Sequence, residues 1–324
     1  MATNILKERY TGKINTVTLG ATKEQGGTRT STVTVGGETT MPFLHFEGDM
    51  PLKPAVAIEI WDIEPTDWNP LLTEVYADVM ANPAAWAKKC VEKFGAEIIY
   101  LRLKGADPDL GDKSPEECAK VVKDVLAAVG VPLIVVGCGV NEKDALVLPV
   151  VAEAASGENL LLGVAKQDHY KSIVAAAMVH KHKVLALSPL DINICKQLNI
   201  LITEMGLSSE DIIIDPSSAG LGYGIEYTYS VLERGRMGAL GGDKMLSMPV
   251  CSTVGFEAWR AKEANALEED FPGWGTIAER AILWEAMTAV GLTQGGAHIM
   301  VMRHPESIAL FKKNIEELMV KPEL

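Results

Sequence analysis

The chain has 324 residues, of which 48% are hydrophobic, and its 30 Lys and Arg against 43 Asp and Glu give a formal net charge of −13. This length and composition exclude a disordered chain, and the negative charge disfavours nucleic acid and anionic membrane surfaces as partners because it repels phosphate. The apolar runs are shorter than the roughly 18 residues that cross a bilayer, and Lys7, Glu8 and Arg9 precede any apolar leader. We therefore expect a cytoplasmic protein.

The first 54 residues differ from the rest in being rich in Thr and Gly. Residues 14–19 and 32–35 alternate like strands, and Gly36 and Gly37, which tolerate positive φ, follow the second run. Residues 39–46 could return as a second strand after this glycine pair, and residues 32–35 and 39–46 would then form a hairpin. We assign residues 1–54 to an N-terminal β-hairpin segment that packs outside the following domain, and residues 55–324 to that domain.

From residue 55 onward, short apolar runs rich in β-branched residues alternate with helical patterns. Continuous apolar runs are typical of strands buried on both faces, as in a parallel sheet covered by helices. The eight predicted strands are residues 55–61, 98–104, 133–137, 160–164, 184–187, 212–215, 246–251 and 297–302. Residues 271–275, between the last two strands, interrupt two helical patterns and are interpreted as a loop.

Two helices have clear start signals. Ser114 and Pro115 occupy capping and first-turn positions and are followed by apolar residues at helical spacing, and His304 and Pro305 open the last helix. Eight strand-then-helix units over roughly 270 residues predict an α/β fold, the (β/α)8 TIM barrel. A doubly wound sheet would need fewer strands, and no G-x-G-x-x-G follows the first strand.

Ligands of such barrels bind at the C-terminal strand ends, so the residues that follow each run are the candidates. They are Asp62, Lys104, Asp107, Gly137, Cys138, Gly163, Lys166, Ser188, Asp191, Asn193, Asp215, Ser252 and Arg303. Lys104 or Lys166 could act as a Schiff-base nucleophile if desolvated. Polar residues at loop starts also act as helix caps, and no catalytic set of nucleophile, base and orienting group can be assembled from spacing alone.

The segment after the sixth strand, residues 215–227, is the most distinctive. Gly220, Gly222 and Gly224 let the backbone approach a bulky flat or anionic ligand, and Tyr223 and Tyr227 offer faces for stacking. A tight strand-to-helix connection is the structural alternative. Gly137, Cys138 and Gly139, after the third strand, form a second stretch of small residues at the C-terminal end of the barrel, here taken as a second rim of the site.

The five cysteines, Cys90, Cys118, Cys138, Cys195 and Cys251, never approach a C-x-x-C spacing. His180 and His182, two residues apart, would point to different helix faces. We therefore predict no metal site in this chain, and expect Cys118 and Cys195 to act as small hydrophobic residues.

Residues 33–48, the strand 55–62 and the loop 215–227 closely resemble the small subunit of the corrinoid iron-sulfur protein of acetogenic bacteria, whose methanogen counterpart is the delta subunit of acetyl-CoA decarbonylase/synthase. The resemblance runs nearly end to end. It implies a TIM barrel paired with a large subunit that carries the iron-sulfur cluster and the main corrinoid-binding domain, with cobalamin between that domain and the top of the barrel.

The resemblance also implies a place in the Wood–Ljungdahl pathway of carbon fixation. The heterodimer would take a methyl group from a methyltetrahydrofolate:corrinoid methyltransferase, hold it on cobalt, and pass it to acetyl-CoA synthase/CO dehydrogenase. This chain would be a non-catalytic or co-catalytic subunit that covers and positions the cofactor. The residues expected to border the cobalamin are Gly137, Cys138, Ser188, Asn193, Gly220, Gly222, Tyr223 and Gly224.

A self-sufficient pterin-binding methyltransferase on the same kind of barrel is the alternative function. Such barrels hold pterin through Asp and Asn side chains at strand ends, and Asp62, Asp107, Asn193 and Asp215 could take those roles. Their spacing forms no specific motif. A purely structural scaffold is a third interpretation.

Overall fold

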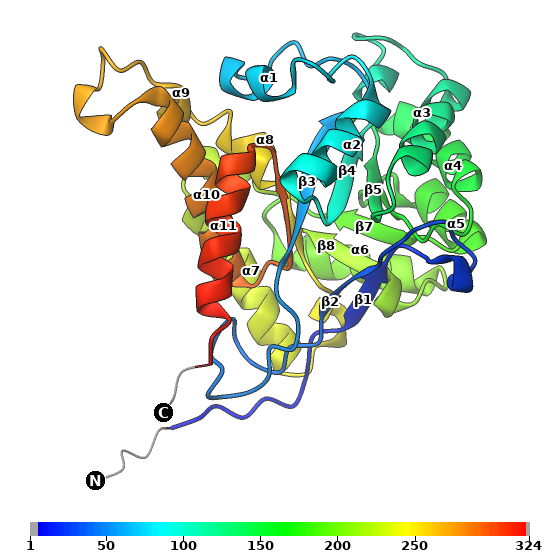
Figure 1. The fold of residues 1–324 in the computed structure, drawn as a ribbon. Coiled ribbons are helices and arrows are strands. Elements are labelled where there is room, and N and C mark those ends of the chain that lie inside the picture. The colour runs from blue at the N-terminus through cyan, green and yellow to red at the C-terminus, as the bar shows by residue number, and fades with distance from the viewer. Residues whose placement is uncertain (1–5, 322–324) are drawn as a thin grey trace.

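The computed structural model describes residues 6–321 and contains an eight-stranded parallel barrel surrounded by helices (Figure 1). In sheet order its strands are β8 (Ile212–Asp215), β7 (Lys183–Leu187), β6 (Leu161–Ala165), β5 (Leu133–Val136), β4 (Ile98–Arg102), β3 (Ala55–Trp61), β10 (Ile299–Met302) and β9 (Cys251–Ser252). A bridge between Ile214 and Val250 joins the two ends of this order. The predicted TIM barrel is confirmed.

The helices cover the outside of the barrel. They are α1 (Pro70–Tyr76), α2 (Pro83–Phe94), α3 (Pro115–Ala128), α4 (Asn141–Ala154), α5 (Tyr170–His180), α6 (Ile192–Glu204), α7 (Ile225–Leu240), α8 (Val254–Ala258), α9 (Lys262–Asn265), α10 (Ile277–Gly295) and α11 (Pro305–Leu318). The start of α3 follows the predicted signal, since the Ser114 hydroxyl accepts a hydrogen bond from the backbone N–H of Glu117. Within residues 6–321 no helix combines the length and apolar character needed to cross a membrane.

The strand predicted for residues 246–251 is mostly wrong. Asp243 caps a 3-10 turn over Lys244–Leu246, and Pro249, which has no N–H to donate to a ladder, precedes the short strand β9. The predicted loop at residues 271–275 is confirmed, with a single 3-10 turn at Pro272–Trp274. The other strands lie at or within two residues of their predicted bounds.

The N-terminal segment forms a hairpin, but not the one predicted. Strand β1 (Thr16–Leu19) pairs antiparallel with β2 (Val33–Gly36) in a separate two-stranded sheet. The expected strand at residues 39–46 is wrong, because Pro42 lacks a backbone donor and turns close from Leu44 to Met41 and from Glu47 to Leu44.

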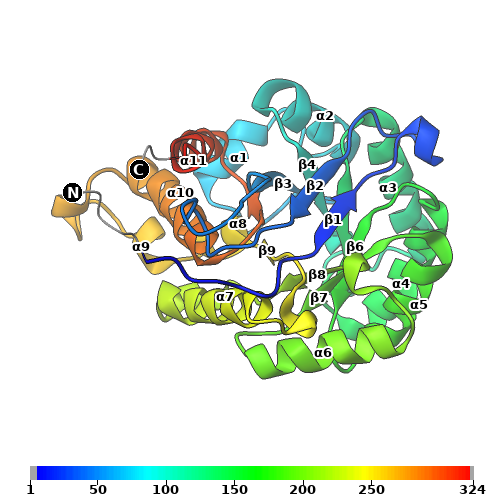
Figure 2. The same ribbon diagram turned by 90° about the horizontal axis from the view of Figure 1, so that it is seen from below.

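The hairpin lies across the end of the barrel opposite the C-terminal strand ends, as the view from below shows (Figure 2). Val17, Leu19 and Val35 are at most 1% exposed and belong to the same hydrophobic cluster as the inward-facing strand residues Tyr100 and Leu185. The hairpin is thus a separate sheet, but its apolar side chains pack into the hydrophobic core of the barrel. Because the core is shared, removing the hairpin at the predicted domain boundary would also remove part of the core of the barrel.

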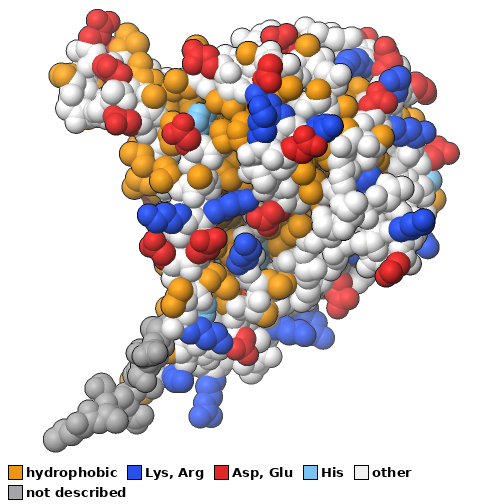
Figure 3. Space-filling model, in the orientation of Figure 1, with side chains coloured by type: hydrophobic (Ala, Val, Ile, Leu, Met, Phe, Trp, Pro, Cys, Tyr) orange, Lys and Arg blue, Asp and Glu red, His pale blue; other side chains and the backbone are white. Residues whose placement is uncertain are grey.

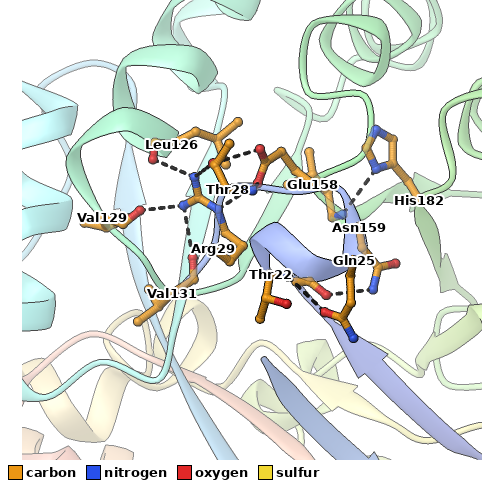
Figure 4. A network of polar contacts seen from close by, with 12 residues as sticks. Thr22, Gln25, Thr28, Arg29, Leu126, Val129, Val131, Glu158, Asn159 and His182 are labelled. Carbon is orange, nitrogen blue, oxygen red and sulfur yellow. Dashed lines mark hydrogen bonds and ion pairs between the residues drawn. The ribbon is translucent and has the colours of Figure 1, made fainter. Parts of the chain in front are cut away.

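A buried arginine ties the connection between β1 and β2 to the barrel (Figure 4). The Arg29 guanidinium donates to the backbone oxygens of Leu126 and Val129 at the end of α3 and forms an ion pair of 2.8 Å with Glu158. Asn159 donates to the backbone oxygens on either side of Leu19. These contacts fix the hairpin against the lower end of the barrel.

Candidate functional site

The loops that follow the C-terminal strand ends form a common surface, here called the mouth. In Figure 1 it is the upper end of the barrel, where α1 follows β3, and the two chain ends lie at the lower side. Side chains of several strands meet at this end of the barrel. Two groups stand out, an arginine cluster on β3 and β4 and just after β10, and a polar group at the ends of β7, β8 and β9.

A buried carboxylate organises the first group. Glu59 of β3 is fully buried, and its two oxygens accept hydrogen bonds from Arg102 Nε at 2.9 Å and Arg303 Nε at 2.8 Å. The strand register explains the meeting, because Met302 of β10 pairs with Ile58, which brings Arg303 opposite Glu59. On the other side of β3, Trp61 pairs with Arg102.

The charges in this cluster stabilise one another. Burial by itself raises the pKa of Glu59, but the guanidinium groups of Arg303 and Arg102 outweigh burial and lower that pKa to about 2. The Glu59 side chain is therefore ionised at neutral pH. Since an unpaired buried charge is costly, all three side chains depend on the ion pairs being complete.

Aromatic rings cover the arginines. The Arg303 guanidinium carbon lies 4.4 Å from the centroid of the Trp68 ring, and that of Arg102 lies 4.9 Å from Phe256 of α8. Arg260 stacks over Phe256 at 4.0 Å and pairs with Asp67. The arginine side of the mouth is thus a rigid layer of alternating planar groups.

The polar group contains a carboxyl and several hydroxyls. Asp215, the last residue of β8, is 3% exposed, and burial raises its pKa to about 6 although Arg102 and the Ser217 N–H act in the opposite direction. The hydroxyls of Ser188, Ser218 and Ser252 are buried and have no hydrogen-bond partner among residues 6–321. Buried polar atoms without partners are uncommon in folded proteins, and a bound ligand or an ordered water is one way to satisfy them.

The raised pKa of Asp215 predicts a pH-dependent gain from Asp215→Asn. A buried acid with a raised pKa destabilises the fold when it is ionised, so the cost is full above pH 6 and disappears as the pH falls toward the unfolded value near 4. Urea denaturation should show the variant more stable than wild type by about 2 to 3 kcal/mol at pH 7.5 and equal to it near pH 3.5. Asp168→Asn, at an exposed position, is the control. Equal stability of both variants at pH 7.5 would contradict this reading of Asp215.

The predicted glycine loop lies at the mouth, but its glycines serve different purposes. A side chain at Gly220 would contact Tyr227, and Gly224, at a φ of 149°, would collide with the Glu226 carboxylate. These two glycines are explained by local packing. Gly222 is different, because a Cβ there would meet nothing within 4 Å. Tyr223 is 88% exposed beside it.

At the second predicted rim, residues 137–139, the space expected for a ligand is occupied by a side chain of this protein. The Asp144 carboxylate of α4 accepts hydrogen bonds from the backbone N–H groups of Cys138 and Gly139 and from the Cys138 thiol. A Cβ at Gly137 would overlap the same carboxylate. The absence of a side chain at Gly137 thus makes room for Asp144. All five cysteines are buried, and burial raises the pKa of Cys138 to about 12.

Three of the four residues considered for pterin binding have local partners or are exposed. Asp62 accepts from the Gly105 N–H and pairs with Lys113, and Asp107 pairs with Lys104. Asn193 is exposed in the first turn of α6, next to its cap Asp191. Asp62 and Asp215 are both buried at strand ends, but only Asp215 has no ion-pair partner among residues 6–321.

The two lysines considered as nucleophiles have protein partners. Lys104 Nζ lies 2.5 Å from Asp107 Oδ2, and Lys166 Nζ donates to Asn141 Oδ1 at 2.8 Å. Residues 6–321 contain no group of three or more His, Cys, Asp or Glu side chains that could hold a metal ion.

Sequence analysis missed Glu59, Arg102 and Phe256. A signal for the first two was present, since each is a charged residue inside or at the end of an otherwise apolar strand run. A charge in such a run requires a partner when it is buried. Phe256 carried no such signal, because its role depends on where α8 places it over the arginines.

Known proteins resemble this chain in sequence. The family model described as the CO dehydrogenase/acetyl-CoA synthase delta subunit matches residues 16–319. The acetyl-CoA decarbonylase/synthase complex subunit delta of Archaeoglobus fulgidus is 42% identical over 313 residues, which cover 95% of this chain and 69% of the relative. The subunit of the same name from Methanocaldococcus jannaschii is 38% identical over 316 residues, covering 97% of this chain and 76% of the relative.

Solved structures share the fold. A dihydropteroate synthase from Xanthomonas albilineans with 4-aminobenzoic acid has a TM-score of 0.57 and 14% identity, over 83% of this chain and 94% of that structure. The enzyme from Stenotrophomonas maltophilia, with imidazole bound in its active site, has a TM-score of 0.55 and 16% identity, over 83% and 95%. At this level of identity the likeness establishes the barrel architecture alone.

Proposed function

Because the chain belongs to the family of CO dehydrogenase/acetyl-CoA synthase delta subunits, we propose that it is the small subunit of a heterodimeric corrinoid iron-sulfur methyl carrier. This carrier accepts a methyl group from methyltetrahydrofolate through a methyltransferase and delivers it to acetyl-CoA synthase. The observation that carries the proposal is the family match over residues 16–319, together with relatives that are named as subunits of an acetyl-CoA decarbonylase/synthase complex.

In this proposal the mouth covers one side of the corrinoid. Cobalamin carries amide groups around its ring, and the buried hydroxyls of Ser188, Ser218 and Ser252 offer hydrogen bonds that no described residue takes up. Asp215 adds an acceptor, and the exposed ring of Tyr223 offers a flat apolar face. These features support a site for a large, flat, amide-bearing ligand. When bound, the cobalt of the corrinoid would carry the methyl group.

The large subunit supplies the rest of the carrier in this proposal. It holds the iron-sulfur cluster and the main corrinoid-binding domain, while this chain positions and shields the cofactor. The partners are then the large subunit, the methyltransferase, and acetyl-CoA synthase/CO dehydrogenase.

A self-sufficient pterin-binding methyltransferase is the second candidate. The observation in its favour is the barrel that this chain shares with dihydropteroate synthases, which is a likeness of fold alone. Against it, Asp62 and Asp107 are engaged in local ion pairs and Asn193 is exposed. Binding of methyltetrahydrofolate by the chain alone would favour this candidate.

Substituting Gly222 tests whether the loop borders the cofactor. The backbone at Gly222 does not have a positive φ, unlike that at Gly224, and a Cβ at Gly222 meets no protein atom within 4 Å. Gly222→Val should therefore fold and pair with the large subunit normally. Its added volume should act only on the ligand, and we expect cobalt content and methyl transfer from methyltetrahydrofolate to fall about tenfold, a loss of roughly 1.4 kcal/mol.

Gly235→Val is the matched control, because a Cβ there also meets nothing within 4 Å and the residue lies within α7, outside the loop that follows β8. A thermal melt confirms folding of both variants. Full cobalt content and wild-type methyl transfer in Gly222→Val would remove the loop from the site and leave it as a strand-to-helix connection.

A further inference from the structure

The segment of residues 262–287, here called the α9–α10 projection, stands away from the barrel. It follows α8 at the C-terminal end of β9, contains α9, the 3-10 turn Pro272–Trp274 and the first half of α10, and rises at the upper left of the molecule (Figure 1). The projection therefore lies on the same side of the molecule as the mouth. A protein that covers the mouth can reach it.

The projection exposes an unusual amount of apolar surface. Its large apolar side chains that are between 42% and 70% exposed are Leu267, Phe271, Trp274, Leu283 and Met287. Leu283 and Met287 are four residues apart and share one face of α10, and both line a shallow groove with Trp274. Figure 3 shows hydrophobic atoms gathered on this part of the surface. Apolar surface concentrated in this way marks a contact with another molecule.

The surface is held in a defined shape. The rings of Phe271 and Trp274 stack with centroids 4.2 Å apart at 19°. Beneath them the buried Arg280 side chain donates to the backbone oxygens of Ala266 and Gly275 and faces the Trp274 ring. A preformed aromatic pair loses little conformational entropy when it binds, which is the property of an interface anchor.

The charged residues around the apolar side chains indicate which kind of partner can bind there. The exposed charged side chains of the projection are the five acids Glu263, Glu268, Glu269, Asp270 and Glu279 and the single base Lys262. A second copy of this chain would place the same carboxylates against them, and nucleic acid or an anionic membrane would be repelled as well. The complementary surface is an apolar patch ringed by lysine and arginine on a different protein.

We propose that the stacked Phe271–Trp274 pair and the apolar face of α10, within their acidic surroundings, form the docking surface for a basic-rimmed subunit. Resting on the proposed function, we identify that subunit as the large corrinoid iron-sulfur subunit. Its docking here brings it beside the mouth, and the acidic rim steers its approach.

The test measures the affinity of this chain for the purified large subunit by calorimetric titration. The double substitution Phe271→Ala with Trp274→Ala removes the anchor and should raise the Kd at least 30-fold. Glu269→Lys with Asp270→Lys should raise it about tenfold at low salt and much less at high salt, because rim charges are screened. Both pairs of residues are exposed, so the variants should fold, which a thermal melt checks.

Leu146→Ser in α4 and Val179→Ser in α5 are the controls, since these apolar side chains are also exposed but lie elsewhere on the barrel. Wild-type affinity in the Phe271 and Trp274 variant would overturn the docking surface while the proposed function stands. Failure of the wild-type chain to bind the large subunit would overturn both. Self-association of the lone chain that this variant abolishes would assign the surface to a second copy and also overturn the proposal.

Discussion

Replacing Glu59 with glutamine is expected to lower the free energy of unfolding by about 3 to 5 kcal/mol at pH 7, because the change leaves two arginines without their shared counter-charge. Arg303 is 3% exposed, so water cannot solvate its charge, and the hydrogen bonds of 2.8 and 2.9 Å to the carboxylate are lost or weakened. Urea denaturation followed by circular dichroism measures the loss. Such a cost would be a large fraction of the net stability of an ordinary domain.

The pH dependence gives an independent check on the Glu59 prediction. The folded pKa of about 2 lies below the unfolded value of 4.5, so the stabilisation is complete above pH 4.5 and is lost as the pH falls toward 2. The difference between wild type and Glu59→Gln should therefore narrow over that range. Asp124→Asn, which breaks the exposed Lys120–Asp124 pair, should cost less than about 0.5 kcal/mol at any pH. Equal losses in both variants at pH 7 would contradict the assigned role of Glu59.

Deleting residues 1–53 is expected to prevent the barrel from folding. Sequence analysis places residues 1–54 outside the barrel domain, but Val17, Leu19 and Val35 fill the lower end of the barrel interior. Burying three such side chains contributes roughly 5 to 9 kcal/mol, which is comparable to the whole net stability of a domain. The deletion also removes Arg29 from its ion pair with Glu158. We expect an insoluble product, or a soluble one without a cooperative thermal transition.

Point variants of the hairpin show whether the deletion acts by removing buried side chains or merely by shortening the chain. Leu19→Ala should cost about 2 to 5 kcal/mol, because the side chain is fully buried. Thr16→Ala, at an exposed position of the same strand, should cost less than about 1 kcal/mol. A truncated chain that melts cooperatively at the wild-type temperature would show that residues 1–54 form an independent segment, as the sequence had first suggested.

Local patterns made the barrel predictable from sequence. Largely apolar runs such as Ala55–Trp61 and Ile212–Asp215 are typical of strands buried on both faces, and their alternation with helices predicts a parallel sheet. Errors arose where local signals were ambiguous. Residues 39–46 follow Gly36 and Gly37 and were expected to return as a strand, yet Pro42 and two turns prevent ladder hydrogen bonds.

The site was predictable only in its general location. Residues after strand ends do gather at the mouth, but their chemistry depends on contacts between distant segments. Glu59 and Arg303 are separated by 244 residues and meet only through the register of β3 and β10. Similarly, the glycine at residue 137 was interpreted as access for a ligand, whereas the structure gives that space to Asp144. Such assignments require knowing which side chain occupies the space that a small residue leaves.

In the proposed function, the physical role of this chain is to hold and shape the surroundings of the cofactor. Glu59, Arg102 and Arg303 stiffen one side of the mouth, and the buried hydroxyls of Ser188 and Ser252 remain free of partners among the described residues. A rigid surface with hydrogen-bonding groups in fixed positions can orient a large cofactor at little entropic cost. The stability that Asp215 costs at neutral pH is consistent with a polar group kept for a ligand.

The visible spectrum of the corrinoid tests the central claim, that the mouth of this barrel borders the cofactor. The measurement mixes this chain with the cobalamin-loaded large subunit and records the corrin absorption bands, while sedimentation confirms that the pair has formed. We predict that the chain alone is colourless and contains no iron, that pairing shifts the corrin bands, and that Gly222→Val pairs equally well but reduces the shift. Corrin bands that do not change when the pair forms would contradict the claim.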